Sequence, residues 1–257
     1  AIFLIPSAFY SFFDVIYIDP FLGIIAGFTF AQAVLFNPKN KVSVTTLLLS
    51  LSTLVLTKDA GLFIALFVCL YLVISLYSRK EFEYNKWISA VVLIVCVVLP
   101  KISWDLHLKN HSVAKNFGQS IDIAQLLRSI FSGDATDYRW VTFNNFWKAM
   151  SEKKVIIGDT NIQTSYMLLI ALLLIGIYIM SKWVARRWDL GERFRRVATY
   201  SIAMFSGAYT LGMCGMYMFK FSEYEAVRLA SFSRYMNILC SMLLIVFAVL
   251  LLQVIID

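Results

Sequence analysis

Between two long apolar runs lies FSEYEAVRLASFSRY, residues 221–235, a short stretch rich in charged and aromatic side chains. The preceding apolar run covers residues 197–219, and the following run covers residues 236–256. An α-helix of about 20 apolar residues is long enough to cross the hydrocarbon core of a bilayer. The stretch 221–235 is therefore predicted to join two membrane-spanning helices at one surface of the membrane.

Apolar runs of this kind recur along the whole chain. Hydrophobic residues make up 60% of the sequence and charged residues 15%, and the mean hydropathy is +0.74. Soluble domains carry about 45–50% apolar residues. The chain is therefore predicted to be all-α, a polytopic transmembrane helical bundle. A porin-like barrel would need alternating segments of about 10 residues, which the sequence lacks.

Membrane helices are assigned to residues 1–104 and 164–257. The first helix is interpreted as partial, because the sequence opens inside a hydrophobic run, and the chain is read as an N-terminally truncated fragment. The predicted spans are 1–13, 20–36, 42–57, 60–77, 87–104, 164–182, 197–219 and 236–256.

Residues 105–163 are predicted to form one long loop with two amphipathic helices. In residues 121–131 the apolar side chains share one helical face. In residues 142–150 Phe143, Phe146, Trp147 and Met150 recur at helical spacing. Both helices are expected to lie flat at the membrane interface.

The distribution of basic residues predicts the orientation. The linker 182–196 carries six Lys and Arg residues but only two acids, and short loops rich in Lys and Arg stay in the cytoplasm. Counting spans from this linker places the loop 105–163 and the stretch 221–235 on the extracytoplasmic face. The sequence thus predicts a multi-pass protein of the bacterial plasma membrane, with its candidate site on the outer face.

The stretch 221–235 supplies the first candidate site residues. Charge at the mouth of a helix pair is costly unless it pairs, faces water or binds a ligand. Arg228 and Arg234 are predicted to bind phosphate, because the guanidinium is planar, bidentate and permanently charged, and Tyr235 is predicted to line the site. Glu223 and Glu225 are candidate catalytic carboxylates. The alternative is a salt-bridged loop that caps two helices.

Two acids near the start of the chain are further candidates. Asp14 and Asp19 flank a short hydrophobic turn, and Pro20 suits the first position of the following helix. Asp19 is therefore expected to be the N-cap of that helix. Asp14 has no such structural role, and either acid could be a general base, with Asp14 the candidate catalytic residue.

Lys58 and Asp59 interrupt an otherwise apolar stretch. They separate spans 42–57 and 60–77, which are expected to form a tight hairpin. An adjacent Lys-Asp pair in such a turn is costly unless it reaches the surface or lines a cavity. Lys58 and Asp59 are thus predicted to bind the phosphate of a lipid head, and a plain hairpin turn at the interface is the alternative.

Several classes of site find no support in the sequence. The four cysteines Cys69, Cys96, Cys214 and Cys240 lie inside apolar runs without metal-ligand spacing, and are expected to be free thiols. The sequence shows no metal site, phosphate loop or nucleophile elbow. No nucleic acid partner is indicated, because no basic stripe with interleaved aromatic residues is present.

Two sets of residues resemble the glycosyltransferase C (GT-C) superfamily. Ser233-Arg234-Tyr235 opens a late apolar helix and is similar to the Arg-Tyr pair that many bacterial members place at the outer end of a C-terminal helix. YIDPFLG at residues 17–23 and TKDAG at residues 57–61 resemble outer-edge motifs of bacterial cell-surface polysaccharide proteins of this kind.

The resemblance implies a polytopic enzyme that moves a sugar from a polyprenyl-phosphate donor to a cell-envelope acceptor. Arg234 would contact phosphate and Tyr235 would line the site. A divalent cation assists some relatives, but the sequence offers no ligand set for one. The family's signature acid lies after its first membrane helix, and this chain is expected to begin beyond that point.

Two other functions remain open from the sequence. A transporter or flippase of lipid-linked saccharides would carry broken helices and charges at mid-membrane depth, whereas the charges here gather at one edge. A non-catalytic membrane assembly protein would use the same charges only to hold its helices together. The partners expected in every case include the lipid bilayer, and the donor sugar and acceptor are not identified.

Overall fold

The computed structural model describes residues 18–78, 86–111, 137–156, 163–187 and 191–255, together with Arg128. These residues are almost entirely helical. The helices are α3 (Asp19–Val34), α4 (Lys41–Thr57), α5 (Asp59–Ser78), α6 (Lys86–Asn110), α8 (Tyr138–Glu152), α9 (Tyr166–Arg187), α10 (Gly191–Phe219), α11 (Glu223–Val227) and α12 (Phe232–Ile255). The strands are β1 (Lys154–Ile156) and β2 (Gln163–Ser165).

The prediction of a membrane helical bundle is confirmed. Five helices, α5, α6, α9, α10 and α12, are long and apolar enough to cross a membrane, whereas α3 and α4 are shorter apolar helices. Each predicted span from 20–36 onward corresponds to one helix, with ends that differ by a few residues. The predicted span 1–13 lies outside the described residues, as does the helix 121–131 apart from Arg128.

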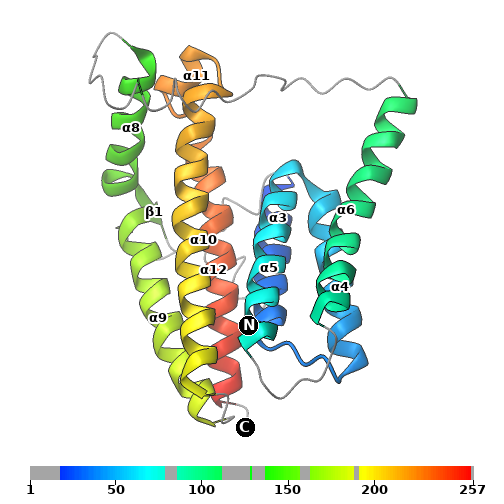
Figure 1. The fold of residues 1–257 in the computed structure, drawn as a ribbon. Coiled ribbons are helices and arrows are strands. Elements are labelled where there is room, and N and C mark those ends of the chain that lie inside the picture. Colours follow the sequence, from blue (N-terminus) through cyan, green and yellow to red (C-terminus); the bar gives the residue numbers. More distant parts are fainter. Residues whose placement is uncertain are drawn as a thin grey trace.

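The helices run up and down in two neighbouring groups (Figure 1). Helices α3 to α6 form one group, and α9, α10 and α12 form the other, with α8 and α11 at one end. The groups meet where α3 packs on α12 and where α5 packs on α10. Residues distant in sequence, from α3 and from α12, are thus brought side by side.

Two glycines allow α3 to approach α12 closely. A Cβ added at Gly23 would lie 3.2 Å from the Ile238 carbonyl oxygen, and one added at Gly27 would lie 2.7 Å from Cβ of Ile245. Both contacts advance along α12 as they advance along α3, so the two helices are parallel. Small residues four positions apart permit such close packing between membrane helices.

Helices α4 and α5 form the expected tight hairpin. Lys58 alone separates them, and its extended backbone turns the chain (φ −164°). The Gly61 amide donates to the Lys58 carbonyl at 2.8 Å. A Cβ at Gly61 would collide with the carbonyl oxygen of Leu54, so this turn requires glycine there.

Helix α6 contains Pro100 and rests on α4. Proline has no N–H, so the carbonyl of Cys96, four residues earlier, loses its partner within the helix. The hydroxyl of Ser52 on α4 donates to this carbonyl at 3.1 Å. A neighbouring helix thereby satisfies a backbone group that lipid cannot.

The long connection between α6 and α9 differs in part from the prediction. Helix α8 confirms the helix predicted at 142–150 and is longer at both ends. Its Phe146 is fully buried and packs against Tyr217 and Phe232, so this apolar face contacts protein. The small antiparallel sheet of β1 and β2 was not predicted, because strands of three residues leave no periodic signal.

Candidate functional site

Asp19 is the centre of a polar cluster, and the prediction that it is an N-cap is wrong. The N-cap of α3 is Ile18, which makes no capping bond with its side chain, and Asp19 is the first residue of the helix. The Asp19 side chain is only 2% exposed. A buried carboxylate is unstable unless it is paired, so its partners matter.

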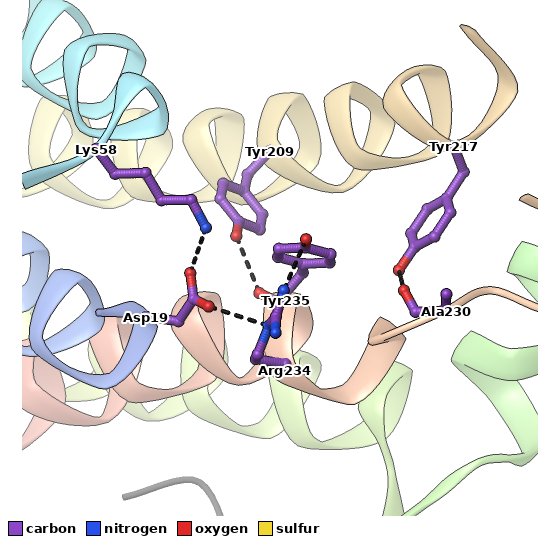
Figure 2. A network of polar contacts seen from close by, with 7 residues as sticks. All are labelled: Asp19, Lys58, Tyr209, Tyr217, Ala230, Arg234 and Tyr235. Carbon is purple, nitrogen blue, oxygen red and sulfur yellow. Dashed lines mark hydrogen bonds and ion pairs between the residues drawn. The ribbon is translucent and has the colours of Figure 1, made fainter. Parts of the chain in front are cut away.

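Two cations from different helices hold Asp19 (Figure 2). Lys58 Nζ, from the α4–α5 turn, donates to Asp19 Oδ1 at 2.6 Å. Arg234 Nε, from the first turn of α12, lies 3.0 Å from Asp19 Oδ2. The side chains of Lys58 and Arg234 are 34% and 22% exposed. Asp19, Lys58 and Arg234 together carry a formal charge of +1, and the two cations reach the surface.

Aromatic side chains cover this cluster on the side of α10 and α12. The Arg234 Nη2 donates to the Tyr235 hydroxyl at 2.9 Å. Lys58 Nζ lies 5.2 Å from the centre of the Tyr235 ring, within reach of a cation–π attraction. Tyr209 on α10 donates to the Tyr235 carbonyl at 2.9 Å (Figure 2). The predicted site residues Lys58, Arg234 and Tyr235 therefore lie together.

The backbone that leads into Arg234 is strained. Leu229 and Ser231, between α11 and α12, have φ values of 51° and 61°. This left-handed region disfavours residues with a Cβ, at about 1–2 kcal/mol each. Tyr217 stabilises the turn by donating to the Ala230 carbonyl at 2.6 Å. Surrounding contacts thus fix the point at which α12 begins.

Asp59 belongs to a second, more exposed network. Lys101 Nζ on α6 lies 2.7 Å from Asp59 and 3.2 Å from Asp105. The side chain of Asp59 is 72% exposed. The neighbours Lys58 and Asp59 were predicted to act together on one phosphate, but their side chains join different networks.

The acids of α11 are placed apart from the Asp19 cluster. Glu225 forms a capping box with Ser222, whose hydroxyl donates to Glu225 Oε2 at 2.8 Å. Arg228 binds the Tyr224 hydroxyl and lies over its ring. Glu223, Glu225 and Arg228 are exposed, and none contacts Asp19 within the described residues. The structure thus gives Glu225 a local structural role, and the catalytic roles of both acids stay predictions.

Asp14 and the four cysteines are the remaining residues considered from the sequence. Asp14 lies outside the described residues. Among the residues that are described, no group of three His, Cys, Asp or Glu side chains could hold a metal ion. The four cysteines are free, as expected.

Asp19 is the residue whose role sequence reasoning missed. Its place before Pro20 has a local explanation as a cap, which hid the pairing with Lys58 and Arg234. Two signals were available in the sequence. Gly23 and Gly27 are four residues apart, a spacing typical of close helix packing. Asp19 is also a carboxylate at the edge of an apolar helix. Together they indicate that α3 packs closely on another helix and that Asp19 needs a cation there.

The basic side chains of the linker lie at the opposite end of the bundle. Arg187 donates to the Val254 carbonyl near the end of α12, and Arg195 donates to the Tyr178 hydroxyl. Asp19, Asp59 and Lys101 lie at the other end, as do the first turns of α3 and α12 (Figure 1). Of the candidate residues that the structure describes, Lys58, Asp59 and Arg234 thus lie at one end of the bundle, and the extracytoplasmic location stays a prediction.

A comparison of the chain with models of known protein families, with characterised proteins and with solved structures finds no match.

Proposed function

We propose that the chain is a membrane glycosyltransferase of the GT-C kind, which moves a sugar from a polyprenyl-phosphate-linked donor to a cell-envelope acceptor. Transfer takes place at the outer face of the bacterial plasma membrane. One observation carries this proposal: Lys58 and Arg234, from separate helices, converge on the single carboxylate of Asp19.

In this proposal Lys58 and Arg234 bind the phosphate of the donor. Lys58 and Arg234 come together at Asp19, and their side chains are 34% and 22% exposed, so an anionic ligand can reach both cations. Arg and Lys are the side chains that bind phosphate in proteins. Asp19 is too buried to meet a substrate, and it acts as a positioning residue that fixes the two cations.

The reaction needs little covalent chemistry from the protein. An acceptor hydroxyl forms a bond to the anomeric carbon of the sugar, and the bond from that carbon to the phosphate oxygen breaks. Lys58 and Arg234 stabilise the negative charge that develops on the departing phosphate. A carboxylate takes the hydroxyl proton, and Asp14, Glu223 and Glu225 are the candidates.

A non-catalytic assembly protein is the second candidate, and a specific observation favours it. Asp19 joins α3, the α4–α5 turn and α12, which is what a purely structural clamp would do. In this case the cations serve the fold alone, and no phosphate binds them.

Complementation with the full-length gene tests the proposal. Arg234→Ala, Lys58→Gln, Glu223→Gln, Glu225→Gln and Asp14→Asn are scored for surface polysaccharide at matched membrane levels. Arg234→Ala and Lys58→Gln, each of which removes one cation, are expected to abolish surface polysaccharide. Lipid-linked precursor should then accumulate on the outer leaflet. Lys148→Gln is the control, because Lys148 is exposed and forms only a surface ion pair with Glu152, at 3.9 Å.

Other outcomes identify the other functions. Precursor trapped on the inner leaflet would indicate a flippase and overturn the transferase. Normal product from Arg234→Ala and Lys58→Gln would identify a structural clamp. Labelling of a cysteine at position 225 from both sides of the membrane, depending on substrate, would also support transport.

A further inference from the structure

A second candidate binding site lies between α5 and α10, near the basic end of the bundle. It is a cavity of about 490 Å³ lined by Ile74, Arg196, Val197, Tyr200, Ser201 and Met204. Helix α5 contributes Ile74 from near its C-terminal end, and α10 contributes the other residues from its first half. Helices α5 and α10 belong to the two neighbouring groups of helices in Figure 1.

The lining of the cavity changes along α10 from polar to apolar. Arg196, Tyr200 and Met204 follow one another at four-residue spacing, and so form a stripe about 12 Å long. The stripe is open, because Tyr200 is 67% exposed and Met204 is 61% exposed. Gly207 continues it, and a Cβ added there would meet nothing within 4 Å.

Arg196 differs from Arg187 and Arg195 in its contacts. Arg187 donates to the Val254 carbonyl at 2.8 Å, and Arg195 donates to the Tyr178 hydroxyl at 3.1 Å. Arg196 makes no hydrogen bond or ion pair within the described part of the chain. Its guanidinium is exposed at the rim of the cavity and can accept an anion.

We propose that this cavity binds an anionic phospholipid. The phosphate of the head group pairs with Arg196, with the Tyr200 and Ser201 hydroxyls as additional donors. An acyl chain follows Met204 and Ile74 toward the middle of the bilayer. The site does not depend on the proposed function, because it shares no residue with the Asp19 cluster.

A lipid fits better than a soluble anion. A free phosphate needs only the polar end, whereas the apolar stripe gives the cavity a length that an acyl chain fills. Leu70 and Ile74 on α5 are 48% and 42% exposed and continue this apolar surface. Basic pockets between membrane helices are known to bind anionic head groups in this way.

Native mass spectrometry of the purified full chain tests the site. The chain is mixed with equal amounts of phosphatidylglycerol and phosphatidylcholine, and the ratio of retained lipids is measured. We expect phosphatidylglycerol to be enriched, and Arg196→Gln to lower this ratio about fivefold, the effect of one interfacial cation. Ser201→Phe, which fills the cavity and keeps the charge, is expected to reduce the retention of both lipids.

Arg186→Gln is the matched control, because it removes one charge from the same end of the bundle outside the cavity. It is expected to change the ratio less than twofold. The proposal is overturned if Arg196→Gln leaves the ratio unchanged, or if both variants lower it equally, since the attraction would then come from the basic end as a whole. Displacement of the lipid by millimolar glycerol phosphate would assign the site to a soluble anion.

Discussion

Two helix seams end in ion networks on the same side of the molecule, but they differ in burial. The α3–α12 seam carries Asp19, whose side chain is 2% exposed, and the α5–α6 seam carries Asp59, whose side chain is 72% exposed and pairs with Lys101. Adjacent residues, Lys58 and Asp59, supply one partner to each network. Residues of the same type therefore contribute differently to stability, because burial determines how strongly their charges interact.

The largest effect is expected from Asp19→Ala, which leaves two cations without their shared carboxylate. Removing one partner of a buried ion pair costs about 3–5 kcal/mol, and the partial exposure of Lys58 and Arg234 places this case near 3 kcal/mol. The free energy of unfolding in mixed micelles measures the loss. A loss no larger than that from Asp105→Ala would show that burial gives Asp19 no special weight.

Gly27→Ala tests the packing beneath the same network. Its added Cβ would lie 2.7 Å from Cβ of Ile245 and 2.9 Å from the Met242 carbonyl oxygen. Overpacking of this kind costs about 2 kcal/mol, to be read from the same unfolding curves. Gly207→Ala is the control, because open space surrounds Gly207. Equal effects at both glycines would contradict close packing of α3 on α12.

Ser52→Ala tests the packing of α6 on α4 through the carbonyl of Cys96. This change removes the donor that compensates for Pro100, so the free energy of unfolding should fall by about 1 kcal/mol. Thr53→Ala is the comparison, because the Thr53 hydroxyl bonds within its own helix. If Pro100→Ala is introduced first, Ser52→Ala should cost less, and an unchanged cost would exclude this compensation.

The smallest effect is expected from Asp59→Asn. Surface ion pairs contribute about 0–1 kcal/mol, and Lys101 keeps Asp105 as a second partner. The expected loss is below about 0.5 kcal/mol, and added salt should reduce it further. A loss comparable to that of Asp19→Ala would mean that the two networks do not differ in the way their burial indicates.

The sequence predicted the elements of the fold well, because apolar run length alone determines which segments can cross a bilayer. It predicted the α4–α5 hairpin from a pair of charged residues between two apolar runs. By counting spans, it also placed the stretch 221–235, which contains Arg234, and the loop 105–163 on the same face. Ser222 and Glu225 have the spacing of a capping box, which could have identified the local role of Glu225.

The partners of the candidate residues could not be predicted in the same way. The pairing of Asp19 with Arg234 depends on which helix packs beside α3, and this is a property of tertiary packing. Nothing in the local sequence shows that Lys58 and Asp59 have different partners. The α4–α5 turn nevertheless directs the Lys58 side chain to α3 and the Asp59 side chain to α6. The helices could thus be predicted from single segments of sequence, whereas predicting the site requires knowing which helices pack against each other.

The parallel arrangement of α3 and α12 has an electrostatic consequence. Both helices begin at the Asp19 cluster, and each helix N-terminus carries a partial positive charge of roughly half an electron from its backbone dipoles. Arg234 lies in the first turn of α12, where the dipole repels a cation, and Asp19 offsets this repulsion. An anion at this end is attracted by the backbone of two helices as well as by Lys58 and Arg234. Replacing either cation alone would therefore weaken that attraction without reversing its sign.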